Sequence, residues 1–258
     1  MTPPRRIFRR PRRGLPRWLA VAIGAATALL ATPAFPQSLT LDLGGGGTAT
    51  AQILQIVALV TVLSLAPGIL VMVTSFTRIV VALSFLRSAL GIQQTPPNMV
   101  LISLALFLTA AIMAPTFERA YSDGIAPYIR GEIDEAAAFD RSVGPFRDFM
   151  LTQVREQDLM LFLDIAKADP NTPAAQAPLT ALIPAFMISE LRRAFEIGFL
   201  LFVPFLIIDM VVSSILMSMG MMMLPPVTVS LPFKLIFFVL VDGWYLVAGS
   251  LVRSFGGG

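Results

Sequence analysis

The sequence predicts an all-α membrane protein in which four long apolar segments form two bent helical hairpins, with a small helical extracytoplasmic region between the second and third segments. Its 258 residues are 56% hydrophobic and 14% charged, with a mean hydropathy of +0.78, which is too apolar for a soluble domain. Several apolar runs are long enough to cross the roughly 30 Å of a bilayer's hydrocarbon core. Charge gathers instead in residues 117–180, which hold eleven acidic and six basic side chains.

Residues 1–34 are predicted to be a cleavable signal peptide. Seven of the nineteen basic residues lie in the first seventeen positions, before a short apolar run at residues 19–31 and a small-residue stretch that ends at Ala34. This order is typical of a secretory signal, and the run is too short for a comfortable span. Cleavage would leave 12 basic against 16 acidic residues, so nucleic-acid binding finds no support. Residues 35–51 include four consecutive glycines and are predicted to be a flexible linker.

Residues 52–116 are predicted to be the first helical hairpin. Its two apolar segments are residues 53–73 and 99–114, and a polar turn with two prolines precedes the second. Pro67 lies inside the first segment and frees the carbonyl oxygen four residues before it, which predicts a helix kink or a break.

Residues 117–183 are predicted to be the acidic extracytoplasmic region. The connection between the first two segments carries Arg78 and Arg87 but no acidic residue, and such positive loops favour the cytoplasmic side. The mature N-terminus, the acidic region and the C-terminus are therefore all predicted to be extracytoplasmic. Residues 145–168 have a helical apolar rhythm, in a region too short to bury a core of its own.

Residues 184–258 are predicted to be the second hairpin, built from apolar segments at 194–217 and 231–252. Pro204 is expected to break or kink the first of these. The Met-rich turn, residues 217–226, joins the two and packs five of the thirteen methionines into seven residues. Methionine is unbranched and adaptable, so this turn is either an apolar connection between membrane helices or a deformable constriction in a pore.

Charged residues interrupt the second hairpin. Asp209, Lys234 and Asp242 all lie in apolar surroundings, where a charge at the centre of a span costs about 2.5–3.5 kcal/mol and usually faces a partner or a water-filled cavity. A structural ion pair and a role in transport both account for them. Glu190, which precedes the third segment, is interpreted from chemistry alone as part of a solvated or interfacial helix start.

The composition also excludes most catalytic chemistry. The chain has no Cys and no His, which removes thiol nucleophiles, Cys/His metal sites and His-based triads. Asp209 and Asp242 both lack the Gly-x-Gly-Asp context of an intramembrane aspartyl protease. We therefore expect no enzymatic activity, no cofactor and no bound metal.

From about residue 52 to the end, the chain resembles the FliP family, the P subunit of the flagellar type III export gate. The similarity rests on several runs that occur in order and with matching spacing. These are residues 73–80, 86–91, 93–98, 184–199, 204–209, 231–234 and 241–244, together with the Met-rich turn.

The resemblance implies roles for particular residues. Met221, Met222 and Met223 are similar to a methionine gasket that seals the closed channel around its substrate. Asp209 and Lys234 align with charged positions that are important for assembly or function. The set of charged residues that we assign to assembly is completed by Asp242, Glu190 and Arg78, and the helix kinks at Pro67 and Pro204 suit hairpins that must bend.

The resemblance also implies partners and a location. The chain is expected to form a homo-oligomer, a pentamer-like ring, and to combine with the Q and R subunits and other export-apparatus membrane proteins. Unfolded proteins would pass through the gate, which would lie in the bacterial inner membrane at the flagellar basal body, with much of it raised above the bilayer plane. The alternatives are the homologous subunit of an injectisome and, in a different class, a small-solute or ion transporter that uses Asp209.

Overall fold

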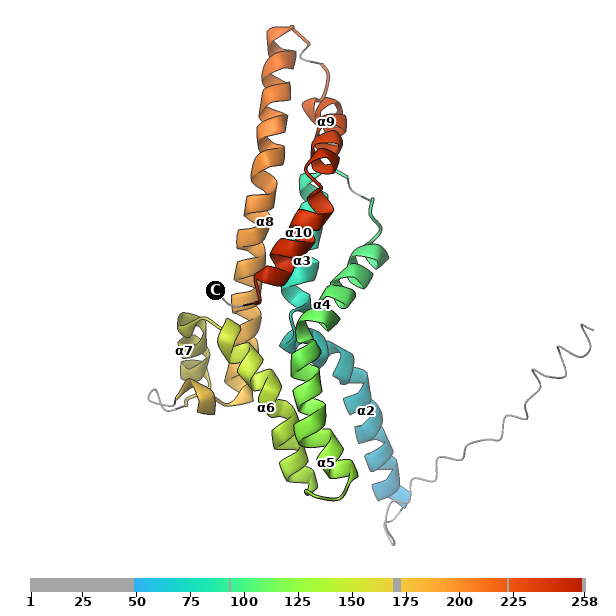
Figure 1. Ribbon diagram of the computed structural model, residues 1–258, viewed down its shortest axis with the longest axis vertical. Coiled ribbons are helices and arrows are strands. Elements are labelled where there is room, and N and C mark those ends of the chain that lie inside the picture. The colour runs from blue at the N-terminus through green and yellow to red at the C-terminus, as the bar shows by residue number, and fades with distance from the viewer. Residues whose placement is uncertain (1–48, 93, 169–172, 222, 257–258) are drawn as a thin grey trace, which may run out of the picture. The chain divides into compact units, whose positions relative to one another are not determined.

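The structure is a computed structural model that describes residues 49–92, 94–168, 173–221 and 223–256. Contacts divide the chain into residues 1–57 and residues 58–258. The predicted signal peptide and nearly all of the predicted linker lie outside the described residues. Every regular element in the described ranges is a helix (Figure 1), which confirms the all-helical prediction for this part of the chain.

The first described helices are α2 (Ala49–Val73), α3 (Phe76–Ala89) and α4 (Asn98–Ala120), followed by the π-helical turn η1 (Tyr121–Ile125) and α5 (Ala126–Ile129). Most of the connection expected between the first two apolar segments forms helix α3, which packs against α4 and α8. The predicted end of the second segment before Pro115 is wrong, since α4 continues through this proline.

The acidic region contains α6 (Glu135–Gln153), α7 (Glu156–Ile165) and the 3-10 turn η2 (Ala174–Gln176). The side chain of Asp134 caps α6 by accepting a hydrogen bond from the Ala137 amide at 3.0 Å. The apolar rhythm of residues 145–168 does not form one helix. Val154 and Arg155 are extended, and the amide of Arg155 bonds to the hydroxyl of Ser189 on the following helix at 3.0 Å.

The C-terminal part consists of α8 (Leu179–Ser218), α9 (Pro226–Leu240) and α10 (Gly243–Arg253). The break expected at Pro204 is absent, because α8 is one helix of 40 residues. Pro67 likewise lies inside the continuous helix α2, and a kink at either proline stays a prediction.

The fourth apolar segment is not one straight helix. Its two halves, α9 and α10, meet at an angle of 64°. Asp242 forms the bend with a left-handed backbone at φ 52°, a conformation that Asp tolerates better than most residues. Gly243 follows, and a Cβ atom there would lie 2.1 Å from the ring of Phe238. The missing side chain of Gly243 therefore lets this ring lie against the backbone at the bend.

Among the residues that the structure describes, three helical stretches are long and apolar enough to cross a membrane, namely Ile56–Val73, Asn98–Ile129 and Leu179–Ser218. The α9–α10 pair would be a fourth if its bent halves count as one span. This supports a membrane protein, while the arrangement as two hairpins stays a prediction.

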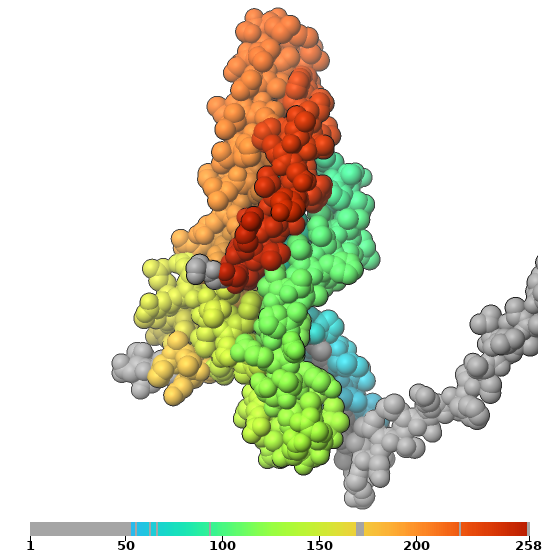
Figure 2. Space-filling model, viewed as in Figure 1, coloured from blue at the N-terminus to red at the C-terminus, as the bar shows by residue number. Residues whose placement is uncertain are grey.

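The described side chains of residues 58–258 form two hydrophobic cores. The larger lies where α3 meets α8 and is joined by side chains of α4, α9 and α10. The smaller is shared by α6, α7 and the first half of α8, as expected for a region that cannot bury a core alone. Figure 2 shows α9 lying along α8, with the far end of these two helices uncovered on this face.

Candidate functional site: two buried charge clusters and the Met-rich turn

The first charge cluster is centred on Arg78 and Glu190, whose side chains are both 0% exposed. Nε and Nη2 of Arg78 donate to the two carboxylate oxygens of Glu190 at 2.8 and 2.5 Å. This two-pronged geometry matches the planar guanidinium to the carboxylate. The interpretation of Glu190 as a solvated helix start is therefore wrong. Arg78, counted above as a free positive charge for orientation, is neutralised inside the protein.

The remaining donors of Arg78 reach two further parts of the chain. Nη2 also donates to Oε1 of Gln153 at 2.9 Å, and Nη1 donates to the carbonyl and hydroxyl oxygens of Ser254, each at 3.0 Å. The guanidinium carbon lies 3.6 Å from the ring centre of Phe255. These contacts join α3, α6, α8 and the end of α10 through one side chain. Arginine has five N–H donors, and the five hydrogen bonds match that number.

The second charge cluster joins Asp209 of α8 to Lys234 of α9. Nζ of Lys234 lies 2.6 Å from Oδ2 of Asp209 and also donates to the carbonyl of Ala89 at 3.2 Å. The hydroxyl of Ser230 donates to the other carboxylate oxygen at 2.5 Å. Lys234 is almost fully buried, and the Asp209 side chain is 33% exposed. The sequence placed both charges correctly in apolar helices, and the structure pairs them.

Asp242 does not belong to either cluster. It is exposed at the bend between α9 and α10, although the sequence places it in the same apolar surroundings as Asp209 and Lys234. The hydrophobic run around it predicted burial, but the bend turns its side chain away from the core. Its role in assembly stays a prediction.

Sequence reasoning missed Gln153, Ser230, Ser254 and the Ala89 carbonyl. Each is a polar group that hydrogen-bonds to a charged side chain from another part of the chain. Neither local spacing nor hydropathy identifies such residues. Within the described ranges, no group of three or more metal-ligating side chains lies close enough to hold an ion.

The Met-rich turn is shaped by the residues that predicted a bend. Gly220 ends α8 with φ +72°, and the amide of Met221 bonds back to the carbonyl of Leu216 at 3.0 Å, as in a Schellman cap. Pro226 then begins α9, a position that suits its fixed φ. Met223 is fully exposed, and Met222 lies outside the described residues.

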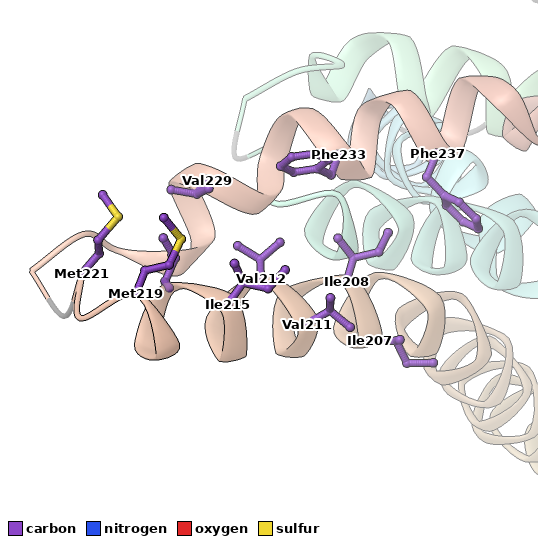
Figure 3. Close-up of a pocket in the computed structure, with 11 residues that line it drawn as sticks. Ile207, Ile208, Val211, Val212, Ile215, Met219, Met221, Val229, Phe233 and Phe237 are labelled. Atoms are coloured by element: carbon purple, nitrogen blue, oxygen red, sulfur yellow. The ribbon is translucent and has the colours of Figure 1, made fainter.

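An apolar groove of about 570 Å³ continues from this turn along α8 and α9. Figure 3 shows Met219 and Met221 at its open end, with Phe233 and Phe237 of α9 facing the side chains of α8. Its lining carries no charged residue, so it offers an apolar contact surface that begins at the turn. The arrangement places sulfur-bearing side chains at the exposed tip of a helix pair.

The chain is similar to known proteins over most of its length. The family model described as the FliP family matches residues 59–251. A protein of Caulobacter vibrioides named flagellar biosynthetic protein FliP is 59% identical over 238 residues, which cover 92% of this chain and 90% of that protein. Proteins of the same name from Rhizobium meliloti and Bacillus subtilis are 52% and 54% identical, over 91% and 78% of this chain and 96% and 91% of their own lengths. The chain therefore belongs to the FliP family.

Proposed function

We propose that this chain is an integral-membrane channel subunit of the flagellar type III protein export gate, with no enzymatic activity. Several copies form a ring, combine with the Q and R subunits, and pass unfolded flagellar proteins across the bacterial inner membrane. The observation that carries this proposal is family membership, since relatives matched over most of their length are named flagellar biosynthetic proteins. Those names favour the flagellar apparatus over an injectisome.

The exposed surface of α8 supports an assembled subunit. Phe195, Phe199 and Leu200 are 58%, 69% and 68% exposed. Burial of a large apolar side chain stabilises by about 1.5–3 kcal/mol, so such a surface favours contact with lipid or with neighbouring subunits. Subunits packed side by side would cover it.

The Met-rich turn supports a gasket at the narrowest point of the ring. Methionine side chains at an exposed tip, above an apolar groove, give a soft surface that adapts to varied substrates. One copy cannot seal a channel, so this role depends on the ring. We propose Met221, Met222 and Met223 as the gasket residues.

The second charge cluster favours a structural role over ion transport. Lys234 already holds Asp209 in an ion pair, and Ser230 bonds to the same carboxylate. A coupling carboxylate would have to leave both partners in every transport cycle. We therefore assign this cluster to helix packing and assembly.

A deletion in the native host tests the proposal. We expect loss of swimming and of flagellar proteins from the culture medium, with normal growth, and restoration of both by a plasmid copy. The comparison strain carries a plasmid copy with Glu196→Gln, which changes only an exposed pair with Arg192. Normal export in the deletion strain, or a growth defect dependent on external ions, would contradict the proposal.

A further inference from the structure

Helix α3 is bonded at each of its ends to one half of the bent α9–α10 pair. Arg78 lies in the first turn of α3 and donates to the carbonyl and hydroxyl of Ser254, directly after α10. Ala89 is the last residue of α3, and its carbonyl accepts from Lys234 of α9. Arg78 and Ala89 are separated along α3 by about 16 Å, at about 1.5 Å per residue. α9 and α10 are thus attached to opposite ends of one helix.

The bend needs such a constraint. Hydropathy predicts one continuous span for residues 231–252, and the two helices together meet the length and hydropathy of a span. A straight segment would keep its backbone hydrogen bonds, whereas the bent one places Asp242 in a left-handed conformation. Asp tolerates that conformation better than most residues but still less well than the helical one, so contacts elsewhere help to offset its cost.

We propose that Arg78 anchors the C-terminus and, together with Lys234, uses α3 as a template that selects the bent form of the α9–α10 pair over a straight span. Three apolar side chains at helical spacing, Val247, Leu251 and Phe255, seat α10 in the larger core. These contacts are non-directional and do not fix register alone. The hydrogen bonds of Arg78 to Ser254 fix the register of α10, because a guanidinium holds its donors in a rigid, planar arrangement.

The burial of Arg78 makes the C-terminus part of the core. The guanidinium is 0% exposed, so any donor released from Ser254 would lose a partner without gaining water. The ring of Phe255 covers its face at 3.6 Å, which adds a cation–π contact in a desolvated place. Ser254 therefore supplies two hydrogen-bond acceptors that Arg78 would otherwise lack in this buried site.

A single introduced cysteine reports on α10, because the natural chain has none. Val247→Cys is a near-isosteric change at a position 6% exposed, and its reaction with N-ethylmaleimide in the detergent-purified full chain measures release of α10. Arg78→Lys keeps the charge opposite Glu190 but loses the fork. Since a hydrogen bond to a charged group corresponds to roughly tenfold or more in an opening equilibrium, we expect labelling at least that much faster in Arg78→Lys. Removal of residues 254–258 should accelerate it likewise.

Two comparisons make the test specific. A second reporter, Ala181→Cys, lies in the smaller core at 1% exposure and should stay protected in the truncated chain. The combined Arg78→Lys and truncated protein should label more slowly than the product of the two single effects predicts, because the bonds to Ser254 are lost in both changes. Arg192→Lys, the same substitution at an exposed pair on α8, should change nothing.

Three results would overturn the proposal. Labelling of Val247→Cys at the parent rate in Arg78→Lys and in the truncated chain would show that Ser254 does not hold α10. Equal acceleration at Ala181→Cys would show general loosening. Multiplied effects in the combined protein would show that Arg78 and the C-terminus act separately.

Discussion

The burial of the Arg78–Glu190 pair makes its disruption unusually costly. Glu190→Leu keeps most of the side-chain volume but removes the carboxylate that receives two hydrogen bonds, at 2.8 and 2.5 Å. Arg78 stays charged and 0% exposed. Breaking a buried pair by removing one partner costs about 3–5 kcal/mol. For a chain of this size, a change of 1 kcal/mol shifts the unfolding temperature by about 2–4 °C, which gives a fall of about 6–20 °C.

The assay is thermal unfolding of the purified full chain in detergent, followed by far-ultraviolet circular dichroism at one scan rate. Glu196→Leu is the matched control, because it makes the same substitution six residues along α8 at a carboxylate 58% exposed. An exposed pair contributes about 0–1 kcal/mol, so this variant should unfold close to the parent protein.

A double variant tests the physical reason. Arg78→Met combined with Glu190→Leu removes both charges, and apolar replacement of a whole buried pair is often neutral or stabilising. We expect the double variant to unfold at a higher temperature than Glu190→Leu alone, although it still loses the contacts to Ser254. The unpaired buried charge is not what destabilises the protein if Glu190→Leu unfolds at the same temperature as Glu196→Leu. The same conclusion follows if the double variant unfolds no higher than Glu190→Leu.

Three further predictions follow from the same packing. Single alanine substitutions at Asp209 and Lys234 should each weaken the oligomer, as measured by native gel electrophoresis. The effects of the two substitutions should be non-additive, and the charge-swapped pair should partly restore the oligomer. Additive effects would refute direct coupling. Gly198→Ala should destabilise by about 1–3 kcal/mol in the same thermal assay, because its Cβ would lie 2.5 Å from a phenylalanine ring of α3 in a packed interface. Alanine at the three gasket methionines of the Met-rich turn should leave the oligomer intact on size-exclusion chromatography but admit small solutes to vesicles; unchanged permeability with normal export would exclude the gasket.

The sequence by itself determined the class of the protein and the places where chemistry is unusual. Long apolar runs require helices in a membrane, because every backbone polar group must be satisfied within the segment. Gly220 and the proline pair marked the turn between α8 and α9 through their backbone preferences. Asp209 and Lys234 stood out because charge is rare in such runs. These signals depend only on neighbouring residues, so they can be read from the sequence without the fold.

The tertiary structure alone decided what those residues contact. Arg78 looked like a loop charge in the sequence, and only the packing of α3 on α8 brings it to Glu190. Its hydrogen bond to the Ser254 carbonyl joins residues 176 positions apart, and helical periodicity does not relate residues at that separation. The bend at Asp242 was likewise invisible, because hydropathy averages over a window and does not record the contacts at either end of α3. Buried hydrogen-bond donors need acceptors. Residues far apart in sequence can supply those acceptors only once the helices have packed.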